Sequence, residues 1–327
     1  MTPERGGTTI PAEIGRTLLL LLVMAGCGTS SKSTGPRPVL PPQNPPVFAL
    51  AWGAPGALGS QFQDPQGIAA GSGGVLYVAD SGNHRIQEFT ANGAFFTLWG
   101  GIGTAKGFFL HPQGIAVDAG GDVYVADTFN HRIQEFDAGG TFLGSWGSYG
   151  GDPGQFRYPS AVGIDPGGHV YVADQGNHRV QVFTAGGTFL AAWGSRGSGD
   201  GQLDNPSGIA LDTTGNVYVA DTNNNRIEEF TTAGVFVRAW GSAGPLNGAF
   251  SSPCGLALDA AGNLYVADRG NNRIQEFNGS GKLLTVWGST GTASGQFNSP
   301  TAVAVAGNGR IYVTDSNNAR IQEFGYP

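Results

Sequence analysis

A strict period of 47 residues runs through this chain of 327 residues and constrains its fold more than any other feature. All six tryptophans obey the period, as do six aspartates, six prolines from Pro65 to Pro300, and six arginines from Arg85 to Arg320. The tryptophans and aspartates are Trp52, Trp99, Trp146, Trp193, Trp240 and Trp287, with Asp80, Asp127, Asp174, Asp221, Asp268 and Asp315. A fixed period in the range of roughly 20–50 residues marks a repeat architecture. A residue that every repeat needs is more easily explained by the structure of the repeat than by catalysis.

Each repeat contains four short runs rich in Val, Ile, Tyr and Phe, separated by Gly, Asn and Asp. In the second copy the runs occupy residues 111–118, 123–127, 132–136 and 141–147. Such punctuation is typical of strands and turns, and no run after residue 46 has helical spacing. Four strands per repeat of this length predict the blade of a β-propeller. Small residues, Ala69 and its equivalents, fall in the first strand, where we expect the blades to converge.

The two ends of the repeat region predict how the ring closes. The last copy ends after its third strand, at residues 320–324, and the missing outer strand stands at the start, at residues 47–53. Phe48 and Trp52 keep the spacing of Phe142 and Trp146. We therefore predict an all-β fold over residues 47–327. It is a six-bladed β-propeller of four-stranded blades, closed by the N-terminal strand completing the last blade. Closure removes the free sheet edges that invite aggregation.

The stretch YVADTFNHRIQEF at residues 124–136 resembles the NHL repeat, whose core is carried by Asn83-His84-Arg85 and its counterparts around His131 and His178. The last three repeats have Asn225, Asn272 and Ala319 in place of the histidine. The resemblance covers residues 47–327 and implies the propeller fold. It leaves activity open, because propellers of this kind scaffold protein complexes, bind RNA, act as extracytoplasmic sensors or carry lyase chemistry.

The first 46 residues predict export and anchoring. An apolar run at residues 18–25 precedes Cys27 and is too short to span a bilayer. We interpret residues 1–26 as a lipoprotein-type signal peptide, Cys27 as the lipidated residue, and residues 27–46 as a Ser/Pro-rich tether. The alternative is an ordinary secretory signal with an incidental cysteine. Gly28 resembles the residue that follows the cysteine in proteins sent to the outer membrane. We expect an extracytoplasmic, membrane-anchored protein.

The charge balance argues against nucleic-acid binding. The formal net charge is −7, and the three lysines are scattered at Lys32, Lys106 and Lys282. Phosphate-driven binding needs a basic stripe, which the chain lacks. With Cys27 acylated, Cys254 would be the one remaining cysteine, and we interpret it as a small buried thiol. His84, His131 and His178 could ligate zinc, but the asparagines that replace them elsewhere favour a polar turn residue.

Residues that the repeat does not demand are the candidates for function. We expect a binding surface where aromatic and arginine side chains gather on the loop-rich face, as protein interfaces favour. Its residues are Phe109, Phe129, Tyr149, Arg157, Tyr158, Arg196 and Arg269. The mouth of the central channel should be lined by one residue per blade, all neutral: Gln66, Gln113, Ser160, Ser207, Cys254 and Thr301.

Two hypotheses of function remain open. The first is a non-enzymatic, lipid-anchored scaffold or binding module for a protein, peptide or glycan of the cell envelope, without a cofactor or bound metal and as a monomeric ring. The second is a metal-dependent lyase or lactonase-like enzyme with its site at the channel mouth. The neutral residues expected at that mouth favour binding over metal chemistry.

Overall fold

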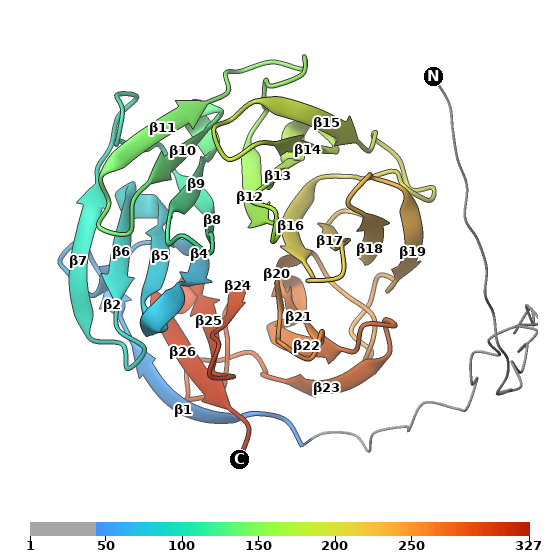
Figure 1. Ribbon diagram of the computed structural model, residues 1–327. Coiled ribbons are helices and arrows are strands. Elements are labelled where there is room, and N and C mark those ends of the chain that lie inside the picture. The colour runs from blue at the N-terminus through green and yellow to red at the C-terminus, as the bar shows by residue number, and fades with distance from the viewer. Residues whose placement is uncertain (1–43) are drawn as a thin grey trace, which may run out of the picture. The chain divides into compact units, whose positions relative to one another are not determined.

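The computed structural model describes residues 44–327, in which six four-stranded antiparallel sheets follow one another around a central axis (Figure 1). The expected signal peptide, Cys27 and nearly all of the tether lie outside these residues. Within residues 44–327 there is no helix long and apolar enough to cross a membrane.

Each blade has its first strand at the axis and its fourth strand at the rim. The first three blades are β4 (Pro65–Ala70), β5 (Leu76–Asp80), β6 (Arg85–Phe89) and β7 (Phe95–Gly100); β8 (Pro112–Val117), β9 (Val123–Asp127), β10 (Arg132–Phe136) and β11 (Phe142–Trp146); β12 (Pro159–Ile164), β13 (Val170–Asp174), β14 (Arg179–Phe183) and β15 (Phe189–Trp193). The last three are β16 (Pro206–Leu211), β17 (Asn216–Asp221), β18 (Arg226–Thr231) and β19 (Phe236–Trp240); β20 (Pro253–Leu258), β21 (Leu264–Asp268), β22 (Arg273–Phe277) and β23 (Leu283–Trp287); β24 (Pro300–Val305), β25 (Ile311–Asp315), β26 (Arg320–Gly325) and β1 (Val47–Trp52).

Short turns and one small ribbon complete the chain. The ribbon pairs β2 (Ala54–Pro55) with β3 (Gln61–Phe62) in parallel. The single-turn 3-10 helices are η1 (Ser72–Gly74), η2 (Ser81–Asn83), η3 (Thr128–Asn130), η4 (Gln175–Asn177), η5 (Arg269–Asn271) and η6 (Ser316–Asn318). Five of them, η2 to η6, join the second and third strands of a blade, so they lie at one end of the ring together with the loops that lead from blade to blade.

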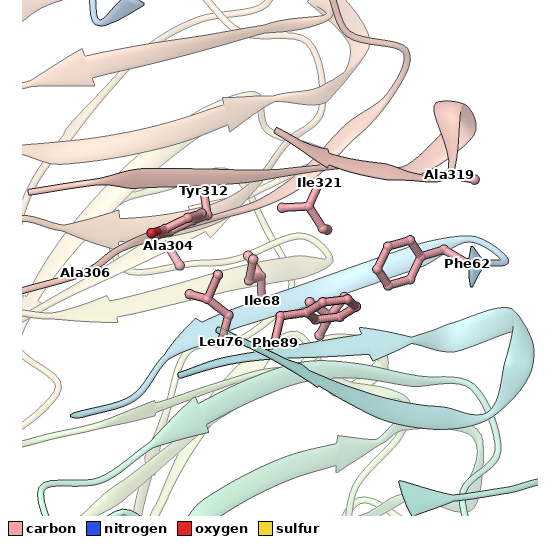
Figure 2. Close-up of a cluster of buried hydrophobic side chains, with 10 residues drawn as sticks. Phe62, Ile68, Leu76, Phe89, Ala304, Ala306, Tyr312, Ala319 and Ile321 are labelled. Atoms are coloured by element: carbon pink, nitrogen blue, oxygen red, sulfur yellow. The ribbon is translucent and has the colours of Figure 1, made fainter. Parts of the chain in front are cut away.

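The ring closes as the sequence predicts. Strand β1 pairs antiparallel with β26, with Phe48 opposite Phe324 and Trp52 opposite Ile321. A cluster of buried side chains joins blade six to blade one at this seam, with Tyr312 and Ile321 on one side and Leu76 and Phe89 on the other (Figure 2). Hydrophobic burial therefore joins the first and last blades as it joins the blades within the chain.

In four of the six blades, a glycine in the first strand allows the close approach of the next blade, whereas blades three and six have Ala161 and Ala302 there. A Cβ atom on Gly67 would lie 2.0 Å from the carbonyl oxygen of Gln113 in the next blade, and one on Gly208 would lie 1.9 Å from that of Cys254. These positions come two residues before the alanine series that we expected to allow the approach. Ala69, from that series, is instead buried between blades one and two, with Tyr77 and Ile115.

The periodic tryptophans pack against glycines of the following blade. Trp146, on β11, lies against the turn after β14, where a Cβ atom on Gly187 would be 2.6 Å from the indole. Gly187 also has a φ of +82°, in the left-handed region that glycine adopts without penalty. Equivalent contacts join Trp52 to Gly93, Trp99 to Gly140, Trp193 to Gly234 and Trp240 to Gly281. A flat indole and a bare backbone thus form a repeated contact between blades.

Substituting Gly187 with alanine should lower the free energy of unfolding by roughly 1–3 kcal/mol, because the new methyl group meets the Trp146 ring and the left-handed backbone strains it. Urea unfolding followed by tryptophan fluorescence measures this change. The matched control is Gly186→Ala, where nothing lies within 4 Å of the new atom. Equal stabilities of the two variants would contradict the proposed contact.

Candidate functional site

A buried aspartate holds together the loop end of every blade. In blade three the Oδ2 atom of Asp174 accepts hydrogen bonds from Arg179 Nε at 2.8 Å, Asn177 Nδ2 at 2.8 Å and Gln181 Nε2 at 3.1 Å. Its Oδ1 atom accepts from the backbone N–H of Arg157 at 2.7 Å. We call the Asp, Asn, Arg and Gln of a blade its polar lock.

The lock also fixes the loop that enters the blade. The Arg179 guanidinium donates to the carbonyl oxygens of Gly151, Asp152 and Gln155. The carboxylate of Asp174 is fully buried, and a buried charge is tolerable only when it is paired and hydrogen-bonded. The aspartate–arginine pair recurs in the other blades at 2.7 Å. These repeated residues are therefore turn and pairing groups of the blade, in line with the structural explanation that their strict repetition favours.

The repeated histidines serve the same structural purpose. The Nδ1 atoms of His84, His131 and His178 accept the backbone N–H of His111, Tyr158 and Asn205 at 3.0–3.1 Å. In blades four and five, Asn225 and Asn272 accept the equivalent bond through Oδ1. Burial lowers the pKa of His84 and of His131, which keeps both rings neutral as acceptors. Across residues 44–327, no three His, Cys, Asp or Glu side chains gather as a metal site would require.

Six aromatic rings form a continuous chain of contacts over the loops of blades one to three. Centroid distances are 4.5 Å from His84 to His111, 5.0 Å from His111 to Phe129 and 5.4 Å from Phe129 to Tyr158. The chain continues over 4.8 Å from Tyr158 to His131 and 4.9 Å from His131 to Tyr149. We call these six residues the aromatic strip. Phe129, Tyr149 and Tyr158 are 46%, 61% and 42% exposed, so the strip presents apolar surface to solvent.

Four members of the strip have a left-handed backbone conformation, and among them only Tyr158 is of a residue type that this conformation does not suit. His111 and Tyr158 have φ values of +49° and +53°. The equivalent positions in the other blades also have positive φ, but carry Asp64, Asn205, Ser252 and Ser299. Aspartate and asparagine enter the left-handed region at low cost, whereas a bulky tyrosine there is an outlier. Such strain is typical of functional positions.

The structure separates the residues that we expected on the binding surface. Phe129, Tyr149 and Tyr158 join the strip, and the Arg157 guanidinium lies 5.3 Å from the centre of the Tyr149 ring. Arg196 and Arg269 are exposed, but neither stacks on an aromatic ring of the described chain, and Arg269 lines the channel mouth.

Phe109 was wrongly assigned to the surface. Its side chain is fully buried and packs 5.9 Å from Trp99 and 5.5 Å from Phe136. Phe109 is a core residue of the repeat: Phe62, Phe156, Phe250 and Phe297 occupy the equivalent position in other blades and are buried too. Sequence reasoning also missed His84, His111 and His131 as members of the strip.

The six expected channel-mouth residues line one pocket at the axis, together with Gln175, Asn205 and Arg269. The side chains of Ser160, Cys254 and Thr301 donate to the carbonyl oxygens of Pro206, Pro300 and Pro65, each in the next blade. The hydroxyl group of Ser207 likewise donates to the carbonyl oxygen of Pro253, at a longer 3.5 Å. Four of the six polar groups thus link blades around the mouth.

Cys254 is a structural residue in this ring. It is buried, and burial raises the pKa of its thiol to about 11, so the reactive thiolate is not formed at neutral pH. The thiol donates at 3.5–3.6 Å where serine or threonine donates in other blades. The expectation of a small buried thiol is confirmed.

These features define a six-bladed β-propeller with four-stranded blades and one decorated loop face. The NHL repeat profile matches six segments: residues 62–89, 109–136, 156–183, 203–230, 250–277 and 297–324. The chain belongs to the NHL-repeat family.

Solved structures with the same fold include enzymes. A streptogramin B lyase is 18% identical, with a TM-score of 0.57 over 81% of this chain and 84% of that one. A gluconolactonase from Xanthomonas campestris is 16% identical, with a TM-score of 0.62 over 88% and 99%. A protein of unknown function from Bacteroides thetaiotaomicron is 18% identical, with a TM-score of 0.66 over 84% and 76%. At these identities the likeness concerns the fold alone. No curated protein sequence matches the chain.

Replacing His131 with asparagine should leave stability at pH 7.5 unchanged within about 0.5 kcal/mol, because Asn225 and Asn272 make the same bond. His131 has a folded-state pKa below its ordinary value of 6.5. Its contribution to stability is therefore present above pH 6.5 and is lost as the pH falls below 6.5. The variant should lose less stability than the wild type between pH 7.5 and 5 in urea unfolding. Parallel pH curves for the two proteins would contradict the acceptor role of the ring.

Proposed function

We propose that this chain is a lipid-anchored, extracytoplasmic binding module that engages a protein, peptide or glycan of the cell envelope through its aromatic strip. The propeller supplies a rigid platform, and the expected signal peptide, Cys27 and tether supply the anchor. Binding energy at protein surfaces concentrates in a few aromatic and arginine side chains, which is the composition of the strip with Arg157.

The strained Tyr158 is the observation that carries this proposal. Folding alone would favour aspartate or asparagine at this position, as in blades one and four. Tyrosine costs about 1 kcal/mol there and leaves its ring 42% exposed. A side chain that is unfavourable for the backbone and 42% exposed gains only part of the stability that full burial would give. Its presence is best accounted for by a contact with another molecule.

The channel mouth supports binding by the strip rather than chemistry at the axis. Most of its polar groups link neighbouring blades, and its residues are neutral apart from Arg269. A lyase or lactonase-like activity remains the alternative. The fold shared with lyases and a gluconolactonase gives it a precedent, but fold does not determine function.

A variant that carries Phe129→Asn, Tyr149→Thr and Tyr158→Asn should fold and lose its partner. Each new residue is the one that another blade has at the same place, namely Asn223, Thr290 and Asn205. Because the Tyr158→Asn change removes left-handed strain, the melting temperature should stay equal or rise. Crosslinking to envelope extract of the host, followed by mass spectrometry, compares the partner captured by the wild type and by the variant.

The matched control for the strip variant is Thr290→Ala with Ser299→Asn, which changes the same loop positions far from the strip. We expect the control to capture the partner as the wild type does. Equal capture by the strip variant would contradict the role of the strip. Stoichiometric bound zinc or calcium with capture unaffected would favour the enzymatic alternative.

Acylation of the peptide that begins at Cys27, seen by mass spectrometry of the purified chain, tests the anchor; an unmodified Cys27 would contradict it.

A further inference from the structure

One blade breaks the polar lock at a buried position. In five blades the fourth member is a glutamine: Gln87, Gln134, Gln181, Gln275 and Gln322. Its Nε2 atom donates to the aspartate at 3.0–3.1 Å and to a loop carbonyl at 2.7–2.8 Å. Its Oε1 atom accepts a loop N–H at 2.8–3.0 Å. The amide thus joins the incoming loop to the lock.

Blade four has Glu228 at this place, and its carboxyl group is fully buried. The Oε1 atom keeps the loop bond, from the N–H of Gly201, at a longer 3.3 Å. The Oε2 atom is buried and has no hydrogen-bond partner. By the symmetry of the blades, the groups that would accept from an amide here are Asp221 Oδ2 and the carbonyl oxygen of Gln202. An ionised Oε2 faces two acceptors and has nothing to donate.

We propose that Glu228 is a proton-operated latch for the loop at residues 194–205. With a proton on Oε2, the carboxylic acid donates to Asp221 or to the Gln202 carbonyl and reproduces the glutamine of the other blades. Without that proton, two buried carboxylates face each other and the loop loosens toward water.

The surroundings of Glu228 favour retention of the proton. Its pKa is raised to about 7, above all by burial; Asp221 and Asp200 also raise the pKa, while Arg226 and the N–H of Gly201 lower it. Asp221 comes from β17, Arg226 from β18 and Asp200 from the loop. Arg226 lies 3.0 Å from Oε1 but also pairs with Asp221 at 2.7 Å, so one cation serves two acids. On β19, Arg238 pairs with Glu229, which points to the opposite face of β18.

The latch would regulate the face that carries the aromatic strip. The loop holds Arg196, which occupies the place of Tyr149, and Asn205, which occupies the place of Tyr158 and binds His178. Arg226 holds the same loop by its Ser198, Gly199 and Gln202 carbonyl oxygens. This regulatory consequence rests on the function proposed above. The latch itself does not.

The pH range follows from the two states of the loop. In the open, hydrated loop Glu228 has its ordinary pKa of 4.5, and in the closed loop a pKa of about 7. The closed state is therefore fully favoured below pH 4.5, loses stability as the pH rises to 7, and changes little above that. Between pH 5 and 7 the opening equilibrium should rise by roughly one to two orders of magnitude.

Amide hydrogen exchange of the full chain tests the latch. Exchange of peptides from residues 194–205 is compared between the wild type and Glu228→Gln at the same pH, which cancels intrinsic exchange. We expect the ratio of wild-type to variant opening to increase between pH 5 and 7 and then to level off. The matched variant Gln181→Glu should give the same behaviour to the loop at residues 147–158.

Two results would overturn the latch: a wild-type to Glu228→Gln ratio that does not change with pH, or a Gln181→Glu variant whose loop ignores pH. Far-ultraviolet circular dichroism checks that each variant is folded, and a Gln181→Glu chain that does not fold leaves the Glu228→Gln comparison decisive. Capture of the envelope partner at pH 5 and 7 is a separate arm. If the exchange of the loop responds to pH but partner capture does not, the proton-operated latch is supported and its proposed effect on binding is contradicted.

Discussion

The buried aspartate at the loop end of each blade is the interaction on which the rest of this propeller depends. A fully desolvated carboxylate needs donors on both oxygens, and each blade supplies them from its own turn and from the incoming loop. The arginine that neutralises the charge also binds three loop carbonyl oxygens. Loops that carry little regular secondary structure are thereby held in place. The loops are held because each blade's buried aspartate orders an arginine that binds their carbonyl oxygens.

Function then depends on what the repeats do not share. Five locks of the same four residues, and a sixth that differs only at Glu228, form a nearly symmetric platform, and symmetry by itself distinguishes no ligand. The aromatic strip breaks the symmetry over blades one to three, and Tyr158 does so against the preference of its own backbone. Glu228 breaks it within a lock, where an acid replaces an amide among acceptors. The strip lies on turns and loops that the locks hold, and Glu228, on β18, binds such a loop through the N–H of Gly201, so each can act on a surface without unfolding a blade.

The sequence was enough to predict the fold, because the period fixed the blade count and the strand spacing fixed the closure. The residues expected at the channel mouth line one pocket, and Cys254 is buried. Phe109 was misassigned although its period of 47 residues matches buried phenylalanines in four other blades. The histidines of the strip were missed for a different reason. The ring of His84 contacts that of His111, and the ring of His131 contacts that of Tyr158, between loops whose path only the structure gives. The expectations about the leader, Cys27 and the anchor stay predictions.

The most direct measurement is the unfolding free energy and partner capture of an Asp315→Asn variant, in the blade farthest along the chain from the strip. Asp315 accepts from Asn318, Arg320 and Gln322, so removing its charge leaves a partly buried guanidinium without its charged partner. The account predicts a loss of roughly 3 kcal/mol in stability with capture unchanged while the protein is folded. Unchanged stability together with lost capture would contradict it, because the repeated aspartates would then be functional groups rather than the frame of the ring.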